Sequence, residues 1–155
     1  MFIGYPSDDF PAPPHVAMEL PEGWEGLHLP DTVLAIREPE VEGSFMANVV
    51  VRARHHRTAP ASEMFEALTA ETAEHELRRV ENFDDETPGL YRAVGSEVEG
   101  HQLVQQHLML LVEQPRTSLT WVTSVVGSSA RGDQASFELI SNTLATTRVF
   151  IPESD

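Results

Sequence analysis

The fold is decided by one stretch, residues 103–126, which reads LVQQHLMLLVEQPRTSLTWVTSVV. Two runs rich in leucine, β-branched and aromatic residues flank a polar connection at 113–118, and this pattern is typical of a β-hairpin. Because residues 108–112 are all apolar, we expect both faces of the first hairpin strand to be covered. Such a strand needs a helix or a second sheet on each side. The stretch therefore predicts a sheet that lies between two other layers.

Further elements are expected on both sides of the hairpin. Alternating apolar and polar residues predict strands at 16–20, 32–37, 45–54 and 90–99. Helical spacing predicts one helix from about Pro60 to Val80 and another from Asp133, as its N-cap, to Thr146. Residues 127–133 are predicted to form a loop. The order is β-β-β-α-β-β-β-α, an α+β fold in which helices cover both faces of a mostly antiparallel sheet.

The chain is expected to form a single domain. Its 155 residues are enough to bury about two-thirds of the surface that the unfolded chain exposes. Residues 1–13 predict an irregular, proline-rich arm, residues 14–150 the domain itself, and residues 151–155 a tail. Neither a signal peptide nor an apolar span of membrane length is visible. We therefore expect no membrane insertion and a cytoplasmic location, or an extracytoplasmic one if an export signal has been removed.

The charge of the chain limits its partners. It carries 25 acidic and 10 basic residues, a formal net charge of −15, and such a surface repels phosphate backbones. Nucleic acid is therefore not an expected partner. The chain contains neither lysine nor cysteine, which excludes a Schiff base, a P-loop, a thiol nucleophile and a disulfide bond.

Residues that could support catalysis or hold a metal show no recognisable spacing. None of the 7 histidines follows a zinc-binding pattern, and the neighbours His55 and His56 point to opposite faces of a strand. The chain has no Gly-x-Ser-x-Gly motif. The acidic residues 81–86 lack the spaced oxygen ligands of a calcium loop, and a solvated turn explains them better. We expect no catalytic residues, no metal site and no cofactor.

Two short motifs, LPEGW at residues 20–24 and FMANVVV at residues 45–51, carry a resemblance to a known family. With the order of elements, they make residues 14–148 resemble the Mog/PsbP-like superfamily, most closely its actinobacterial branch with the LpqN and LpqT lipoproteins. The resemblance implies an α/β/α sandwich that serves as a binding or adaptor module, without established catalytic residues. Members of the superfamily bind a GTPase, photosystem subunits or hydrophobic segments of secretion effectors. This chain lacks the lipobox cysteine of the lipoprotein branch.

The densest basic cluster of the sequence is formed by Arg52, Arg54 and His56, followed by Arg57. On a strand the first three share one face, and on an acidic molecule they can steer an acidic partner segment. The sequence therefore predicts a non-catalytic protein-binding adaptor or chaperone-like module, with these residues at the site and an unknown protein, or a second copy in a homodimer, as the partner. Two alternatives stay open: a small-ligand-binding domain with a cleft between sheet and helix, and basic residues that only offset nearby carboxylates.

Overall fold

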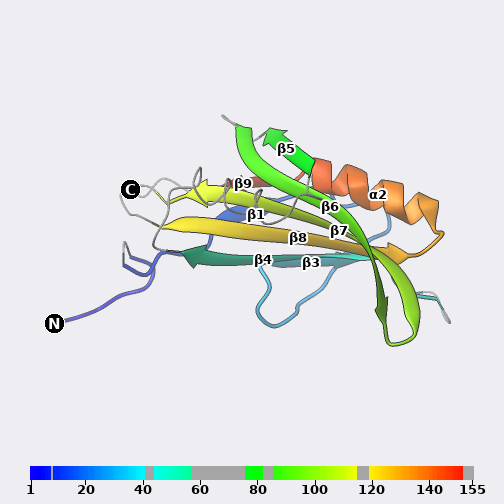
Figure 1. The fold of residues 1–155 in the computed structure, drawn as a ribbon. Helices are drawn as coiled ribbons and strands as arrows, with labels where there is room; N and C mark the ends of the chain where they lie inside the picture. The colour runs from blue at the N-terminus through cyan, green and yellow to red at the C-terminus, as the bar shows by residue number, and fades with distance from the viewer. Residues whose placement is uncertain (8, 41–43, 57–75, 82–85, 115–118, 152–155) are drawn as a thin grey trace.

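The main feature of the fold is an antiparallel sheet. A computed structural model of the chain describes all residues except 8, 41–43, 57–75, 82–85, 115–118 and 152–155. In this part of the chain the sheet has seven strands, in the order β2-β3-β4-β8-β7-β6-β5 (Figure 1). They are β2 (Glu25–Gly26), β3 (Leu34–Arg37), β4 (Asn48–His56), β5 (Glu76–Glu81), β6 (Glu86–Val98), β7 (His101–Glu113) and β8 (Thr120–Ala130). The hairpin predicted from the sequence, β7 and β8, lies near the middle of the sheet.

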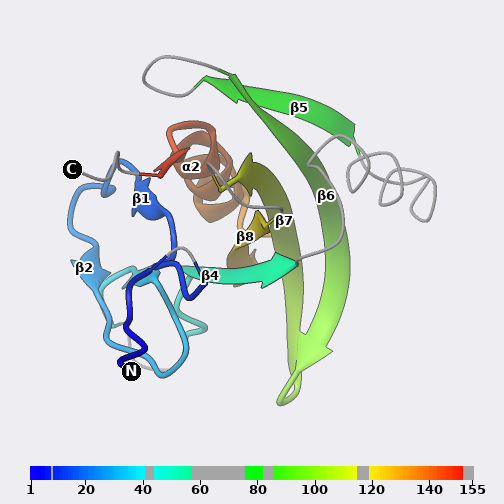
Figure 2. The ribbon, with the colours of Figure 1, turned by 90° about the vertical axis from the view of Figure 1, so that its left-hand side faces the viewer.

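One face of the sheet is covered by the helix α2 (Gln134–Ala145). We call this the inner face and the opposite one the outer face. Figure 2 shows the sheet curving around α2, with β5 and β6 beyond one side of the helix and β4 on the other. A second, two-stranded sheet pairs β1 (His15–Ala17) with β9 (Arg148–Phe150). The segment that follows α2 thus pairs with the N-terminal strand and not with the main sheet.

The central hairpin is longer than the sequence predicts. Its two strands pair at 11 positions, and β8 also pairs with β4 on its other side. Residues 127–130, predicted as part of a loop, continue β8, so that prediction is wrong. The glycine at 127 is needed inside the strand because a Cβ there would collide with Cγ2 of Ile140 on α2. A glycine that signals a loop in the sequence therefore permits close helix packing in the structure.

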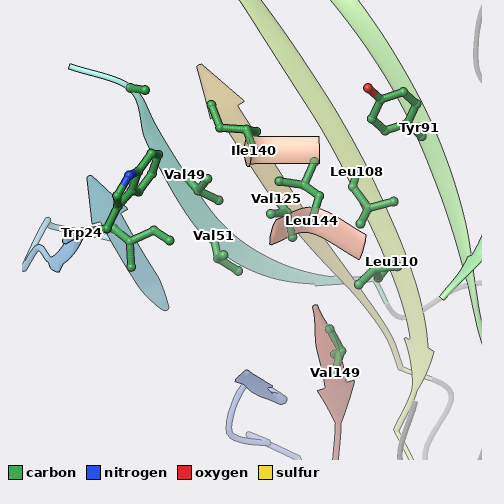
Figure 3. Packing of buried hydrophobic residues seen from close by; sticks show 12 residues of the cluster. Trp24, Val49, Val51, Tyr91, Leu108, Leu110, Val125, Ile140, Leu144 and Val149 are labelled. Carbon is green, nitrogen blue, oxygen red and sulfur yellow. The ribbon is translucent and has the colours of Figure 1, made fainter. Parts of the chain in front are cut away.

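The core lies between the inner face and α2 (Figure 3). The buried cluster consists of Trp24, Ile36, Ala47, Val49, Val51, Tyr91, Leu108, Leu110, Val125, Ile140, Leu144 and Val149. Trp24 follows a turn in which its N–H donates to the Pro21 carbonyl at 3.0 Å. Trp24 itself is buried and belongs to this cluster.

Both faces of β7 are buried in its C-terminal part, as the unbroken apolar run predicts. Leu110 faces the core and is 0% exposed, whereas Leu111 points to the outer face and is 2% exposed. Within the described residues α2 is the only helix, and it packs on the inner face. The expectation of helices on both faces is therefore not met in this part of the chain, which shows the coarser α+β arrangement of a mostly antiparallel sheet with a helix on one face.

The helix predicted from Pro60 to Val80 is replaced at its end by a strand. Residues 57–75 lie outside the described residues, but β5 spans Glu76–Glu81 and pairs with β6. The helical prediction for residues 76–80 is therefore wrong. The reason is that β6 begins at residue 86, earlier than predicted, and pairs with β5 in a hairpin. Pairing with a neighbouring strand outweighs local helix propensity there.

The second helix and the other strands match their predictions apart from their ends. α2 begins after Asp133, whose Oδ1 accepts a hydrogen bond from the Ser136 N–H at 3.1 Å, so the predicted N-cap is confirmed. The strands predicted at 16–20, 32–37, 45–54 and 90–99 correspond to β1, β3, β4 and β6. The side-chain amide of Asn48, at the start of β4, donates to the Met46 carbonyl at 3.1 Å.

Candidate functional site

The predicted site residues lie on one strand of the sheet. Arg52, Arg54 and His56 occupy alternate positions of β4, which share one face. Val51, at an intervening position, belongs to the core on the inner face, so the predicted site lies on the outer face. The side chains of Arg52 and Arg54 are exposed. Arg57 lies outside the described residues.

The two exposed arginines differ from a third arginine of the outer face. Arg37 on β3 forms an ion pair with Glu25 on β2, with 2.8 Å between Nη2 and Oε1, and its Nε donates to the same oxygen at 2.9 Å. Arg52 and Arg54 have no ion pair or side-chain hydrogen bond in the part of the chain that the structure describes. Nearby carboxylates of that part therefore do not neutralise them. Two cationic side chains are left available to a partner.

The basic character of the outer face extends to β6 and β7. The strand register places Val50, Val126, His107 and Arg92 side by side in one row across four strands. Arg92 is half-buried, and its Nε has no hydrogen-bond partner among the described residues. The sequence could not join Arg92 to the site, because local alternation assigns a residue to a face but does not show which strands lie side by side. Only the pairing of four strands brings it toward β4.

Past Val51, β4 has a neighbouring strand on one side only within the described part of the chain. β3 pairs with the first four residues of β4, and the N–H of Val33 donates to the Val51 carbonyl at 2.8 Å. The segment before Val33 turns away from the sheet at residues 29–32, where Asp31 has a left-handed φ of 56°. No strand of the described residues lines the side of residues 52–56 that faces away from β8. We call this side of residues 52–56 the free edge of β4.

The inner-face side of the free edge has a different character. Ala53 is half-buried, and the ring of His55 packs edge-to-face on Trp121 of β8, with 5.0 Å between the ring centroids. Trp121 is 3% exposed, and its indole N–H donates to Gln114 Oε1 at 3.1 Å. The free edge is therefore flanked by two arginines on the outer face and by Ala53 and the imidazole ring of His55 on the inner face.

The space between the sheet and α2, the alternative site, contains polar groups that serve the fold. Gln106 of β7 is 0% exposed; its Nε2 donates to the Phe137 carbonyl at 3.0 Å, and its Oε1 accepts from the Tyr91 hydroxyl at 2.8 Å. The bond to Phe137 ties α2 to β7, and the bond from Tyr91 ties β6 to β7. The buried hydroxyls of Thr123 and Ser129 have no hydrogen-bond partner in the described part of the chain. They lie on one strand at a separation of about 20 Å, so they do not converge on a single small ligand.

No group of three His, Asp or Glu residues among those described is placed to hold a metal ion. Likewise, no helix in the described ranges has the length and apolar character needed to cross a bilayer. The chemistry available on the outer face is that of guanidinium groups, which pair with carboxylates.

Comparison with known proteins shows a likeness in fold. No family model and no curated protein matches the chain. It is similar to the crystal structure of LpqN, involved in cell envelope biogenesis of Mycobacterium tuberculosis, with a TM-score of 0.66, 9% identity and coverage of 91% of this chain and 86% of that one. It is also similar to a protein of Bacteroides thetaiotaomicron VPI-5482, with a TM-score of 0.62, 12% identity and coverage of 88% of this chain and 45% of that one. At these identities the comparisons show the fold alone, and that fold is LpqN-like.

Proposed function

We propose that this protein is a non-catalytic protein-binding module that holds an acidic segment of a partner protein at the outer face of its sheet. The observation that carries the proposal is the pair Arg52 and Arg54. Both side chains are exposed at alternate positions of one strand, and neither has an ion-pair partner in the described part of a chain with a net charge of −15.

The arginine pair suits an acidic segment for two physical reasons. A guanidinium group binds a carboxylate through two parallel hydrogen bonds, which fixes the orientation of both groups. Alternate residues of a strand are about 7 Å apart, so carboxylates at alternate positions of an extended segment match the spacing of Arg52 and Arg54. The negative charge of the rest of the molecule repels an acidic segment elsewhere and so directs it to these two residues.

The likeness in fold supports a binding role without naming a partner. LpqN is described as involved in cell envelope biogenesis, so the cell envelope is one setting for a module of this fold, beside the cytoplasm. We extend the proposal to membership of the Mog/PsbP-like superfamily and to its α/β/α sandwich. A structure that describes the whole chain tests that part, because it would show whether a helix also covers the outer face.

Binding of labelled peptides tests the proposed function. The probe is a short fluorescent peptide that alternates glutamate and valine, and its control carries glutamine in place of glutamate. We expect the glutamate peptide to bind about tenfold more tightly than the glutamine peptide, a difference of about 1.4 kcal/mol, because only carboxylates pair with the arginines. Fluorescence anisotropy at low and high salt measures it, and added salt should weaken binding of the glutamate peptide alone.

Two double variants separate local contact from net charge. Arg52→Glu/Arg54→Glu should abolish binding of the glutamate peptide. Arg131→Glu/Arg148→Glu changes the net charge by the same amount, but Arg131 lies before α2 and Arg148 lies on β9. This second variant should therefore bind the glutamate peptide nearly as well as the wild type. Circular dichroism establishes that both variants are folded. If the two variants bind with the same affinity, the outer face around β4 is not the site.

A further inference from the structure

We propose that the acidic segment binds as an added strand on the free edge of β4, with backbone hydrogen bonds to Ala53 and His55. This inference rests on the proposed function and specifies how the segment is held. In strand addition the main-chain hydrogen bonds provide affinity, and alternating side chains provide specificity. The contacts of Arg52 and Arg54 with carboxylates would then select a segment that the backbone of β4 holds in register.

The direction of the backbone groups in β4 carries the inference. Successive residues of a strand in an antiparallel sheet direct their N–H and C=O groups to opposite sides. The carbonyl of Val51 accepts from the N–H of Val33, so it points to the side of β3. By alternation, the N–H and C=O groups of Ala53 and His55 point the same way, where the described part of the chain provides no partner. Two donors and two acceptors at the free edge are therefore without a partner among the described residues.

The side chains along the free edge specify the segment that fits. An added strand places alternate residues beside Arg52 and Arg54 on the outer face and the intervening ones beside Ala53 and His55 on the inner face. The outer positions favour carboxylates, because both arginines are exposed and unpaired within the described residues. The inner positions favour apolar side chains, because His55 packs on buried Trp121. The fitting segment alternates acidic and apolar residues.

A second unpaired edge, on β6, lacks this combination. Past Tyr91, where pairing with β5 ends, β6 has β7 on one side and no described strand on the other. By the same alternation, Ala93, Gly95 and Glu97 direct their backbone groups outward there. Glu97 is exposed, and a charged side chain on an edge discourages pairing with another chain. Glu97 therefore disfavours an acidic segment along this edge, which makes β6 an internal control for β4.

N-methylated peptides separate strand addition from attraction by charge alone. A methyl group on a peptide nitrogen removes a donor and blocks one edge of the peptide but leaves its carboxylates intact. Two versions of the glutamate–valine peptide are methylated on every second amide nitrogen, one on its glutamates and the other on its valines. These are the two phases of methylation. One phase should bind about tenfold more weakly than the unmethylated peptide and the other should bind normally, because an added strand uses one of its two edges.

The possible results of this experiment distinguish the two proposals. If both methylated phases bind as well as the unmethylated peptide, strand addition is wrong and the charge-based function stands. If the unmethylated glutamate peptide itself does not bind, the proposed function fails, and strand addition of such a segment fails with it. Loss of binding in one phase alone supports both proposals.

Two matched proline variants test the free edge on the side of the protein. Ala53→Pro removes an outward N–H from β4, and Ala93→Pro removes one from β6; proline is tolerated on a strand where the N–H faces solvent. Ala53→Pro should weaken binding of the unmethylated peptide about tenfold, whereas Ala93→Pro should leave it within about twofold of the wild type. If both variants have the circular dichroism of the wild type and bind the peptide with equal affinity, the segment does not bind at the free edge.

Amide hydrogen exchange gives a readout in the wild-type protein. The N–H groups of Ala53 and His55 should exchange rapidly in the free protein and become protected at saturating glutamate–valine peptide. Those of Ala93 and Gly95 should exchange rapidly in both states. Unchanged exchange at Ala53 and His55 under saturation would contradict strand addition even if both proline variants failed to fold.

Discussion

The inner-face and outer-face residues of β4 differ in burial and in charge. Val49 and Val51 are 0% exposed in the core, whereas Arg52 and Arg54 are exposed on the other side of the sheet. The period of two of a β-strand lets one segment contribute to both surfaces. Under the proposed function, stability and binding therefore depend on opposite faces of the same strand, and we expect substitutions to change them separately.

The energetics of the two faces follow from burial. A fully buried valine or leucine contributes about 1.5 to 3 kcal/mol through removal of apolar surface from water. An exposed side chain contributes within about 0.5 kcal/mol in either direction. Substitutions on the inner face should therefore lower the free energy of unfolding, and substitutions of the exposed arginines should change affinity with little effect on stability.

The largest effect is expected for Leu110→Ala. The side chain is completely buried on the inner face of β7, and its truncation should lower the free energy of unfolding by about 2 to 5 kcal/mol. Met109→Ala, at the half-buried neighbouring position on the outer face, should cost less than half as much. Urea denaturation of both variants measures the difference. If the urea midpoint of Leu110→Ala equals that of the wild type, the assignment of the central hairpin to the core is wrong.

Gly127→Ala should have the next largest effect, because its new Cβ would collide with Cγ2 of Ile140. Overpacking of this kind costs about 1 to 3 kcal/mol. In an Ile140→Ala background, where Cγ2 is absent, the same change should cost nothing measurable, and a double-mutant cycle from thermal or urea unfolding shows the coupling. An equal cost in both backgrounds would mean that glycine is needed at this position for another reason.

A smaller effect is expected for Asp133→Ala at the start of α2. Loss of the hydrogen bond from the Ser136 N–H to the Asp133 carboxylate should cost about 1 kcal/mol. Asp133→Asn is the matched control, because asparagine caps a helix about as well as aspartate. If alanine and asparagine variants have the same urea midpoint, the cap does not contribute to holding α2 on the inner face.

The smallest effect on stability is expected for Arg52→Glu/Arg54→Glu. Because both side chains are exposed and form no ion pair in the described part of the chain, the free energy of unfolding should change by about 0.5 kcal/mol or less. The same variant should no longer bind the glutamate–valine peptide. A loss of stability as large as that of Asp133→Ala would show that the outer arginines support the fold, and the contrast between the two faces would then fail.

The sequence by itself determined the features that depend on local patterns. The apolar run at 108–112, the alternation at 45–54 and the cap at Asp133 predicted the hairpin, β4 and α2, because each pattern repeats within one element. The same alternation placed Arg52 and Arg54 on one face. Patterns of this kind need no knowledge of what lies on the neighbouring strand.

Only the tertiary structure decided the features that depend on strand pairing. Residues 76–81 form a strand because β6 lies beside them, although the local sequence predicts a helix there. Residues 127–130 form part of a strand because β4 and β7 lie beside them, although the local sequence predicts a loop. Strand pairing also decides which residues lie in one row with Arg92 across the sheet. It decides the free edge of β4 as well, which exists because β3 ends early. A strand's hydrogen bonds are made to residues far away in the chain, so its length, register and open edges are not encoded in its own pattern.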